Sequence, residues 1–127
     1  RDMDYYVRYM EMRLKQYHIL ERLAADLERL FGAPRQAYLI ANFMRTVALS
    51  LHEYNNAGAL LEELEQVRGV FRADELPVSR EEFEDRAVLY EMVFALRRLL
   101  IAKRDFTASL TPTQIKLFWK PETPAMG

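Results

Sequence analysis

SREEFEDRAVLYEMVFALRRLLIAKRDF, residues 79–106, decides the fold, because it carries the signals of one long helix. The Ser79 hydroxyl can accept a hydrogen bond from an early backbone amide, and the Glu82 side chain can return one from the Ser79 amide, so a capping box is predicted. Acidic residues fill the first turns and basic residues the last, the order that the helix dipole favours. At ~1.5 Å per residue, a helix of roughly 25 residues is about 37 Å long and sets the long dimension of the domain.

Apolar residues recur along this predicted helix in two rows. One row contains Phe83, Ala87, Tyr90, Phe94 and Ile101, and the other contains Leu89, Val93, Leu96 and Leu100. Together the rows form a face that is wider than one neighbouring helix can cover. We therefore expect this helix to contact at least two others.

The composition is that of one globular domain. The chain has 127 residues, of which 50% are hydrophobic and 29% charged, enough to bury about two-thirds of the surface of the unfolded chain. Eighteen basic residues nearly cancel nineteen acidic ones, so a nucleic-acid partner is not expected. The absence of cysteine excludes disulfides, iron–sulfur clusters and cysteine-based zinc sites within this chain.

Membrane-spanning segments are not predicted in this stretch of chain. No run reaches the ~18–20 apolar residues that a spanning helix needs, since Glu91 interrupts the best candidate, AVLYEMVFAL. The sequence opens on Arg1 rather than on an initiator methionine, and we expect it to be a piece of a longer protein.

Three more helices are predicted before residue 79, over residues 3–31, 34–54 and 57–72. The buried face expected for the first contains Met3, Val7, Met10, Leu14, Tyr17, Leu20, Leu23, Leu27 and Leu30, which follow the helical period. Short loops between helices favour antiparallel neighbours. The sequence thus predicts an all-α fold, an antiparallel up-down bundle of four main helices over residues 1–110. A short helical or irregular tail over residues 111–127 follows, starting with a helix cap at Thr111 and Gln114.

Catalytic and metal-binding patterns are weak. His52-Glu53 resembles the start of a zinc-protease motif, but Asn56 stands where the second histidine is required. No glutamate lies three residues before His18 or His52, as a bundle di-iron site would need. No Gly-flanked serine or Gly-rich phosphate loop is present. We predict no enzyme activity, no metal and no cofactor.

Aromatic and arginine side chains suggest a ligand site. An arginine near tyrosines can bind an aromatic carboxylate through an ion pair and ring stacking. The favoured alternative is structural, with tyrosines at the edge of the core and the arginines paired to Glu11, Glu82 or Glu84. The candidates for contact with an aromatic carboxylate are Tyr9, Arg13, Tyr17, Arg86 and Tyr90.

A second group of candidates is basic and comprises Arg97, Arg98, Lys103 and Arg104. These residues complement the helix dipole and are expected to be solvated. The functional alternative is contact with anionic lipid head groups, to which each basic residue contributes ~1 kcal/mol near a membrane surface.

Three segments resemble the cytosolic C-terminal domain of the FUSC-like aromatic acid exporter family of bacterial membrane proteins. They are YYVRYMEMRLKQYHILERL (residues 5–23), SREEFEDRAVLYEMVFAL (residues 79–96, with Phe83, Glu84, Arg86 and Ala87) and KRDF (residues 103–106). The resemblance spans most of residues 5–106 and transfers no catalytic residue.

The resemblance implies a non-enzymatic helical domain at the cytoplasmic face of the cell membrane, acting in assembly or regulation of a transporter. The expected partners are the membrane-spanning part of the parent chain and a second copy of the domain. The alternative function is sensing of a small aromatic carboxylate within the bundle.

Overall fold

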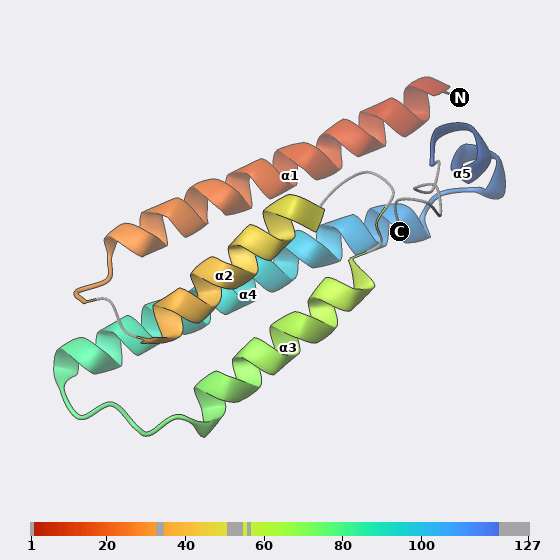
Figure 1. Ribbon diagram of the computed structural model, residues 1–127. Coiled ribbons are helices and arrows are strands. Elements are labelled where there is room, and N and C mark those ends of the chain that lie inside the picture. Colours follow the sequence, from red (N-terminus) through yellow and green to blue (C-terminus); the bar gives the residue numbers. More distant parts are fainter. Residues whose placement is uncertain (1, 33–34, 51–54, 56, 120–127) are drawn as a thin grey trace.

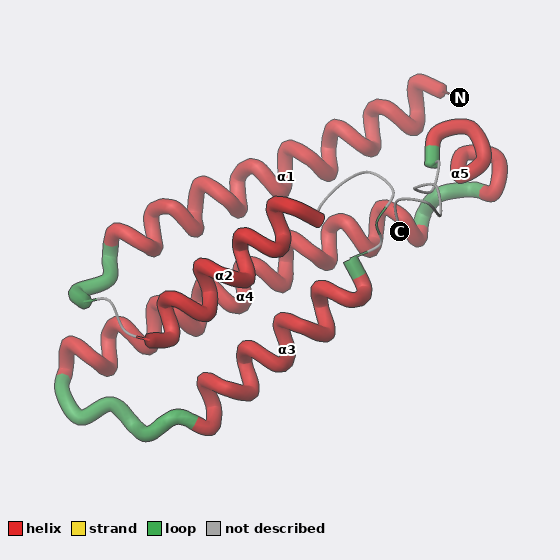
Figure 2. The backbone as a smooth tube through the Cα atoms, viewed as in Figure 1, coloured by secondary structure: helices red, strands yellow, loops and turns green. Residues whose placement is uncertain are grey.

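A computed structural model describes residues 2–32, 35–50, 55 and 57–119, and in that part of the chain all regular structure is helical (Figure 1; Figure 2). The predicted all-α class is confirmed. The helices are α1 (Asp2–Glu28), α2 (Arg35–Ser50), α3 (Gly58–Ala73), α4 (Arg80–Ala108) and α5 (Pro112–Phe118). Helix α4 is the helix predicted over residues 79–106.

Helix α4 begins at the predicted cap. The Ser79 Oγ accepts a hydrogen bond from the Glu82 backbone amide at 3.1 Å. The Glu82 side chain, however, accepts from the Val78 amide at 3.2 Å and not from the Ser79 amide. The first half of the predicted capping box is therefore confirmed, and the return bond is displaced by one residue.

Helix α4 is the centre of the arrangement and contacts α1, α2 and α3. Figure 1 shows α1 and α3 on either side of α4, with α2 in front of α4. The Gln16 side-chain amide donates to the Leu99 carbonyl at 3.3 Å, and the Arg8 guanidinium donates to the Ser109 hydroxyl at 2.7 Å. Since Arg8 lies near the start of α1 and Ser109 follows the end of α4, the two long helices run in opposite directions.

The hydrophobic core lies along α4. Its buried row contains the predicted Leu89, Val93, Leu96 and Leu100. The second predicted row is wrong at Phe83 and Phe94, which are 61% and 47% exposed. A different row is buried instead, and it includes Val88, Met92, Ala95 and Leu99. The reason is that α1, α2 and α3 approach α4 over one broad face, leaving the Phe83–Phe94 side uncovered.

The face predicted for α1 is also wrong over most of its length. Met10 is 63% exposed, whereas Met12 is only 6% exposed. Helix α1 carries two apolar stripes, and the buried one is Tyr5, Met12, Ile19 and Leu23 together with Gln16 and Asp26. In this stripe Gln16 finds a partner in the fold, because its side-chain amide donates to the Leu99 carbonyl of α4, while Asp26 pairs locally with Arg29 at 3.0 Å through one of its two carboxylate oxygens. Of the predicted face, Leu23 is buried and Leu30 is half-buried.

Asp85 of α4 is linked by hydrogen bonds to the end of α1, and we call this pair of hydrogen bonds the Asp85 tie. Its carboxylate accepts from the backbone amides of Phe31 and Gly32 at 2.7 and 3.1 Å, and the side chain is buried. Backbone amides beyond a helix end need partners, and a carboxylate with two acceptor oxygens can satisfy both. Asp85 therefore sets where the chain turns from α1 towards α2.

Helix α5 covers the opposite end of the α1–α4 pair. The predicted cap is confirmed, because Thr111 and Gln114 form a full capping box. The Tyr5 ring stacks on Phe118 with centroids 4.4 Å apart, and Arg8 donates to the Gln114 side-chain oxygen at 3.0 Å. A second, smaller apolar cluster results there, formed by Tyr5, Met12, Ala102, Phe106 and Leu110, with Tyr9, Phe118 and Trp119 against it.

Candidate functional site

The predicted ligand residues of α1 lie towards its N-terminal half. Tyr9 packs edge-on against Phe106 at 5.7 Å and belongs to the smaller apolar cluster. Arg13 donates to the Gln16 side-chain carbonyl at 2.9 Å. Tyr17 is 56% exposed and lies edge-on to His18. Arg13 and Tyr17 therefore face away from α4.

The predicted ligand residues of α4 lie near the other end of the bundle. The Tyr90 ring is edge-on to Phe71 of α3, at 5.6 Å, and Arg86 donates to the Glu75 carbonyl at 3.1 Å. Gln16 of α1 is level with Leu99, so Arg86 lies about 20 Å further along α4 than that level, at ~1.5 Å per residue. The structure thus separates Arg86 and Tyr90 from the α1 residues. The expected pairing of the arginines with Glu11, Glu82 or Glu84 is absent among the hydrogen bonds and ion pairs of the described residues.

Arg86 and Tyr90 instead share a cleft with the α3–α4 connection, which we call the loop cleft. It encloses about 480 Å³ and is lined by Phe71, Arg72, Asp74, Leu76, Pro77, Phe83, Arg86, Ala87 and Tyr90. Asp74 is already engaged, because its carboxylate accepts from Arg35 and Gln36 at 2.6 and 2.7 Å. The lining is mainly apolar and aromatic, and Arg72 and Arg86 supply positive charge. Sequence reasoning identified two of these residues and missed Phe71 and Phe83.

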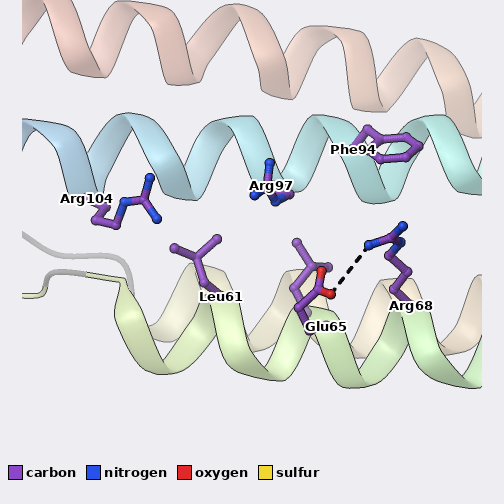
Figure 3. A pocket seen from close by; sticks show the side chains of 7 residues that line it. Leu61, Glu65, Arg68, Phe94, Arg97 and Arg104 are labelled. Atoms are coloured by element: carbon purple, nitrogen blue, oxygen red, sulfur yellow. Dashed lines mark hydrogen bonds and ion pairs between the residues drawn. The ribbon is translucent and has the colours of Figure 1, made fainter.

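A second cleft, which we call the arginine cleft, lies between α3 and α4 (Figure 3). It encloses about 280 Å³ and is lined by Leu61, Leu64, Glu65, Arg68, Phe94, Arg97 and Arg104. Arg97 and Arg104 were singled out from the sequence among the basic residues. Arg68 of α3 was missed, because only the packing of two helices brings it beside them.

The prediction that the basic group is solvated is wrong for Lys103. It is 1% exposed, and its Nζ lies 5.2 Å from the centroid of the Trp119 ring. A cation held over an aromatic face is stabilised there. Arg104 is exposed and lies 3.6 Å from Asp105. Lys103 is therefore packed against Trp119 of the tail. Of the basic group, only Arg97, Arg98 and Arg104 are exposed and can contact a partner.

The α1–α4 side carries a balanced set of charges. Arg29 pairs with Glu91 at 3.1 Å and with Asp26 at 3.0 Å, and Arg22 lies 3.9 Å from Glu91. The hydrogen bond that Arg29 donates to Glu91, together with the negative charge of that carboxylate, raises the pKa of Arg29 above its ordinary value. Two guanidinium groups thus face two carboxylates on this side.

Helix α1 leaves a long apolar surface uncovered, which we call the α1 stripe. Its members are Met3, Tyr6, Val7, Met10, Leu14, Tyr17, Leu20 and Leu27, each more than two-fifths exposed. Apart from the adjacent Tyr6 and Val7, successive members are three, four or seven residues apart, which places them along one side of the helix. The sequence identified most of these residues but assigned them to the core.

None of the described residues forms a group of three or more histidine or acidic side chains that could hold a metal ion. His52 and Glu53, considered from the sequence, lie outside the described residues. Within the same described part of the chain, no helix combines the length and the apolar character that crossing a membrane requires.

Comparison with known proteins identifies the family. Residues 1–104 match the family model described as "Putative aromatic acid exporter C-terminal domain". An uncharacterised protein of Bacillus subtilis (strain 168), YqjA, is 34% identical over 98 residues, which are 77% of this chain and 30% of that protein. The chain thus spans less than a third of this relative, and no solved structure matches it. With the family model covering helices α1 to α3 and most of α4, the chain belongs to the C-terminal domain family of these aromatic acid exporters.

Proposed function

We propose that this domain is a non-enzymatic assembly element of a membrane exporter, at the cytoplasmic face of the membrane, and that it associates with a second copy of itself through the α1 stripe. The family supports the link to an exporter. The observation that carries the assembly role is the α1 stripe, because α1 buries one face against α4 and leaves its second apolar face exposed, with none of the described helices packed over it.

The pattern of the stripe suits a helix–helix contact. Apolar residues spaced three and four apart over several turns form the seam by which two helices pack. Met3 to Leu27 spans about 36 Å at ~1.5 Å per residue, which is long enough for five or so such layers. Only Arg13 and Glu21 introduce charge along its middle.

The occupant that we favour is a second α1 packed antiparallel. Such a pair brings Met and Leu of one stripe against the same residue types of the other, and a self-complementary surface is what a two-fold dimer requires. Overall electrostatic repulsion between two copies of the chain is small, because each carries a net charge of only −1. The polar Arg13 also lies near the middle of the stripe, where it can help to set the register of a pair.

Sedimentation velocity tests the assembly role. We expect the wild-type chain to dimerise with rising concentration, and Leu14→Glu to weaken the dimer by about ten-fold or more, because it places a charge in the apolar seam. Leu49→Glu is the matched control, since Leu49 is 81% exposed on α2, away from the stripe. A wild-type chain that stays strictly monomeric at high concentration would overturn self-association and turn attention to the membrane-spanning part of the parent protein.

A second candidate function is sensing of a small aromatic carboxylate in the loop cleft. Its volume of about 480 Å³ falls in the range typical of small-molecule sites, and the lining combines aromatic rings with guanidinium groups. One Nη1–H of Arg86 donates to the Glu75 carbonyl, so the other N–H groups of Arg86 can donate to a bound carboxylate. Phe83 and Tyr90 offer faces or edges to a ring.

Calorimetry with benzoate, salicylate and indole-3-acetate tests this candidate. We expect saturable binding that Arg86→Gln weakens by about ten-fold, because a charge-assisted hydrogen bond is lost. Arg13→Gln removes the same charge from the other predicted group and is expected to leave the affinity unchanged. No heat of binding with any of the three acids would dismiss the loop cleft as their site.

A further inference from the structure

The arginine cleft brings together guanidinium groups from two helices. Arg97 and Arg104 project from α4 and Arg68 from α3, and Figure 3 shows all three along the same gap between these helices. Leu61, Leu64 and Phe94 complete the lining with apolar groups. None of the three arginines is adjacent to another in sequence, so it is the packing of α3 on α4 that assembles them.

The positive charge of the three arginines in this cleft exceeds the negative charge of the carboxylates that line it. Glu65 is the only carboxylate that lines it, and it lies 3.5 Å from Arg68. Arg104 has Asp105 at 3.6 Å, although Asp105 does not line the cleft. Among the described residues, Arg97 has no carboxylate within ion-pair distance and no hydrogen-bond acceptor. An exposed but uncompensated cation thus lies between two partly compensated ones.

The other side of α4 provides an internal comparison. There Arg22 and Arg29 face Asp26 and Glu91, so two cations meet two anions. The cleft on that side also includes Arg98, the neighbour of Arg97 in sequence. Among the described residues Arg98, like Arg97, has no carboxylate within ion-pair distance. The two clefts differ in their carboxylates, because Asp26 and Glu91 both line the cleft beside Arg98, whereas Glu65 alone of the described residues brings a carboxylate to the arginine cleft.

One guanidinium of the cleft is held in position. Arg68 lies over the Phe94 ring at 5.9 Å from its centroid while it pairs with Glu65. The stacking and the ion pair restrict the side chain, so less conformational entropy is lost when it binds an anion. Arg97 is free to complete the coordination of an anion from α4.

We propose that the arginine cleft is a binding site for a phosphate group. A phosphate monoester carries about −1.5 to −2 charges at neutral pH and three acceptor oxygens, which matches several converging guanidinium groups better than a singly charged carboxylate does. The volume of about 280 Å³ accommodates a phosphate with a small substituent. The phosphate can belong to a soluble ion or ester or to the head group of phosphatidic acid. This inference is independent of the assembly role and of the loop cleft.

Two titrations of the 127-residue chain distinguish the sources. Inorganic phosphate and pyrophosphate are titrated at constant ionic strength while amide and arginine Nε–H shifts are followed by NMR. Co-sedimentation with vesicles of phosphatidylcholine, with and without phosphatidic acid, is measured in parallel. We expect saturable shifts at Arg68 and Arg97, and we expect Arg97→Gln to weaken binding by about ten-fold or more, since one charged hydrogen-bonding group is lost.

Arg98→Gln is the matched control, because it removes the same charge one residue away, from the neighbouring cleft that Asp26 and Glu91 line. Thermal unfolding of both variants verifies that they are folded. Binding of phosphate or pyrophosphate that depends on Arg97 and not on Arg98 assigns a soluble ligand. Binding only to phosphatidic acid vesicles, with the same dependence, assigns the lipid head group. Equal weakening by both variants, or no binding in either titration, would overturn the proposal.

Discussion

Leu23→Ala is expected to lower the free energy of unfolding by about 3–5 kcal/mol, because it removes a large side chain from a closed core and leaves a cavity. Leu23 is 0% exposed in the α1–α4 seam. Leu14→Ala, the same substitution nine residues earlier on α1, is expected to change the free energy of unfolding by less than about 0.5 kcal/mol, since an exposed side chain contributes little. Urea denaturation followed by circular dichroism measures both changes.

The comparison must be made on the monomer. Leu14 belongs to the α1 stripe, so in a dimer its replacement would also cost association energy, which makes the apparent stability depend on protein concentration. Denaturation is therefore carried out at the lowest workable concentration and repeated at a higher one. Equal losses for Leu14→Ala and Leu23→Ala at low concentration would mean that α1 presents the α1 stripe to the core, contrary to the structure.

Asp85→Ala is expected to cost about 3 kcal/mol of stability, because two backbone amides lose a charged acceptor and are left without a partner. The amides are those of Phe31 and Gly32, at 2.7 and 3.1 Å from the buried carboxylate. Urea denaturation gives the size of the loss. Hydrogen exchange of the Phe31 amide reports on the tie itself, and its protection is expected to disappear in the variant.

Glu84→Ala is the control for this substitution. Glu84 precedes Asp85 on α4, is half-buried, and forms no hydrogen bond or ion pair with the described residues. Its replacement removes the same charge without breaking a tie, so a change of less than about 0.5 kcal/mol is expected. A loss for Asp85→Ala no larger than that for Glu84→Ala would show that the turn after α1 is held by other contacts.

Most of the candidate sites could not be predicted from the sequence. The basic residues Arg97 and Arg104 were recognised as a group, but Arg68 lies 29 residues before Arg97, so only the packing of α3 on α4 shows that they share a cleft. Lys103 appeared to belong with them, yet it is buried against Trp119 from the tail. Arg13 and Arg86 were placed in one candidate ligand group, but the register of α1 on α4 puts Arg13 near the middle of the seam and Arg86 towards the end of the seam where Asp85 binds the Phe31 and Gly32 amides.

Local signals in the sequence determined where helices begin and end. The hydroxyl of Ser79, the capping box at Thr111 and the acidic Glu81 and Glu82 in the first turn of α4 act within a few residues, so their effects can be recognised without a tertiary structure. The basic residues predicted for the end of α4 do not lie in its last turn, because the helix continues to Ala108. The same holds for the all-α class and for the row of Leu89, Val93, Leu96 and Leu100, because helical periodicity is a property of the chain alone.

Only the tertiary structure decided which apolar stripe of α1 is buried. Both stripes have helical spacing, and the exposed one is, by sequence, the more apolar of the two. The buried stripe includes Gln16, which would be costly in a core without a partner, and the fold supplies that partner from the Leu99 carbonyl of α4. Apolar periodicity shows that a helix has a face to bury, whereas long-range hydrogen bonds and the shape of the neighbouring helix select which face that is.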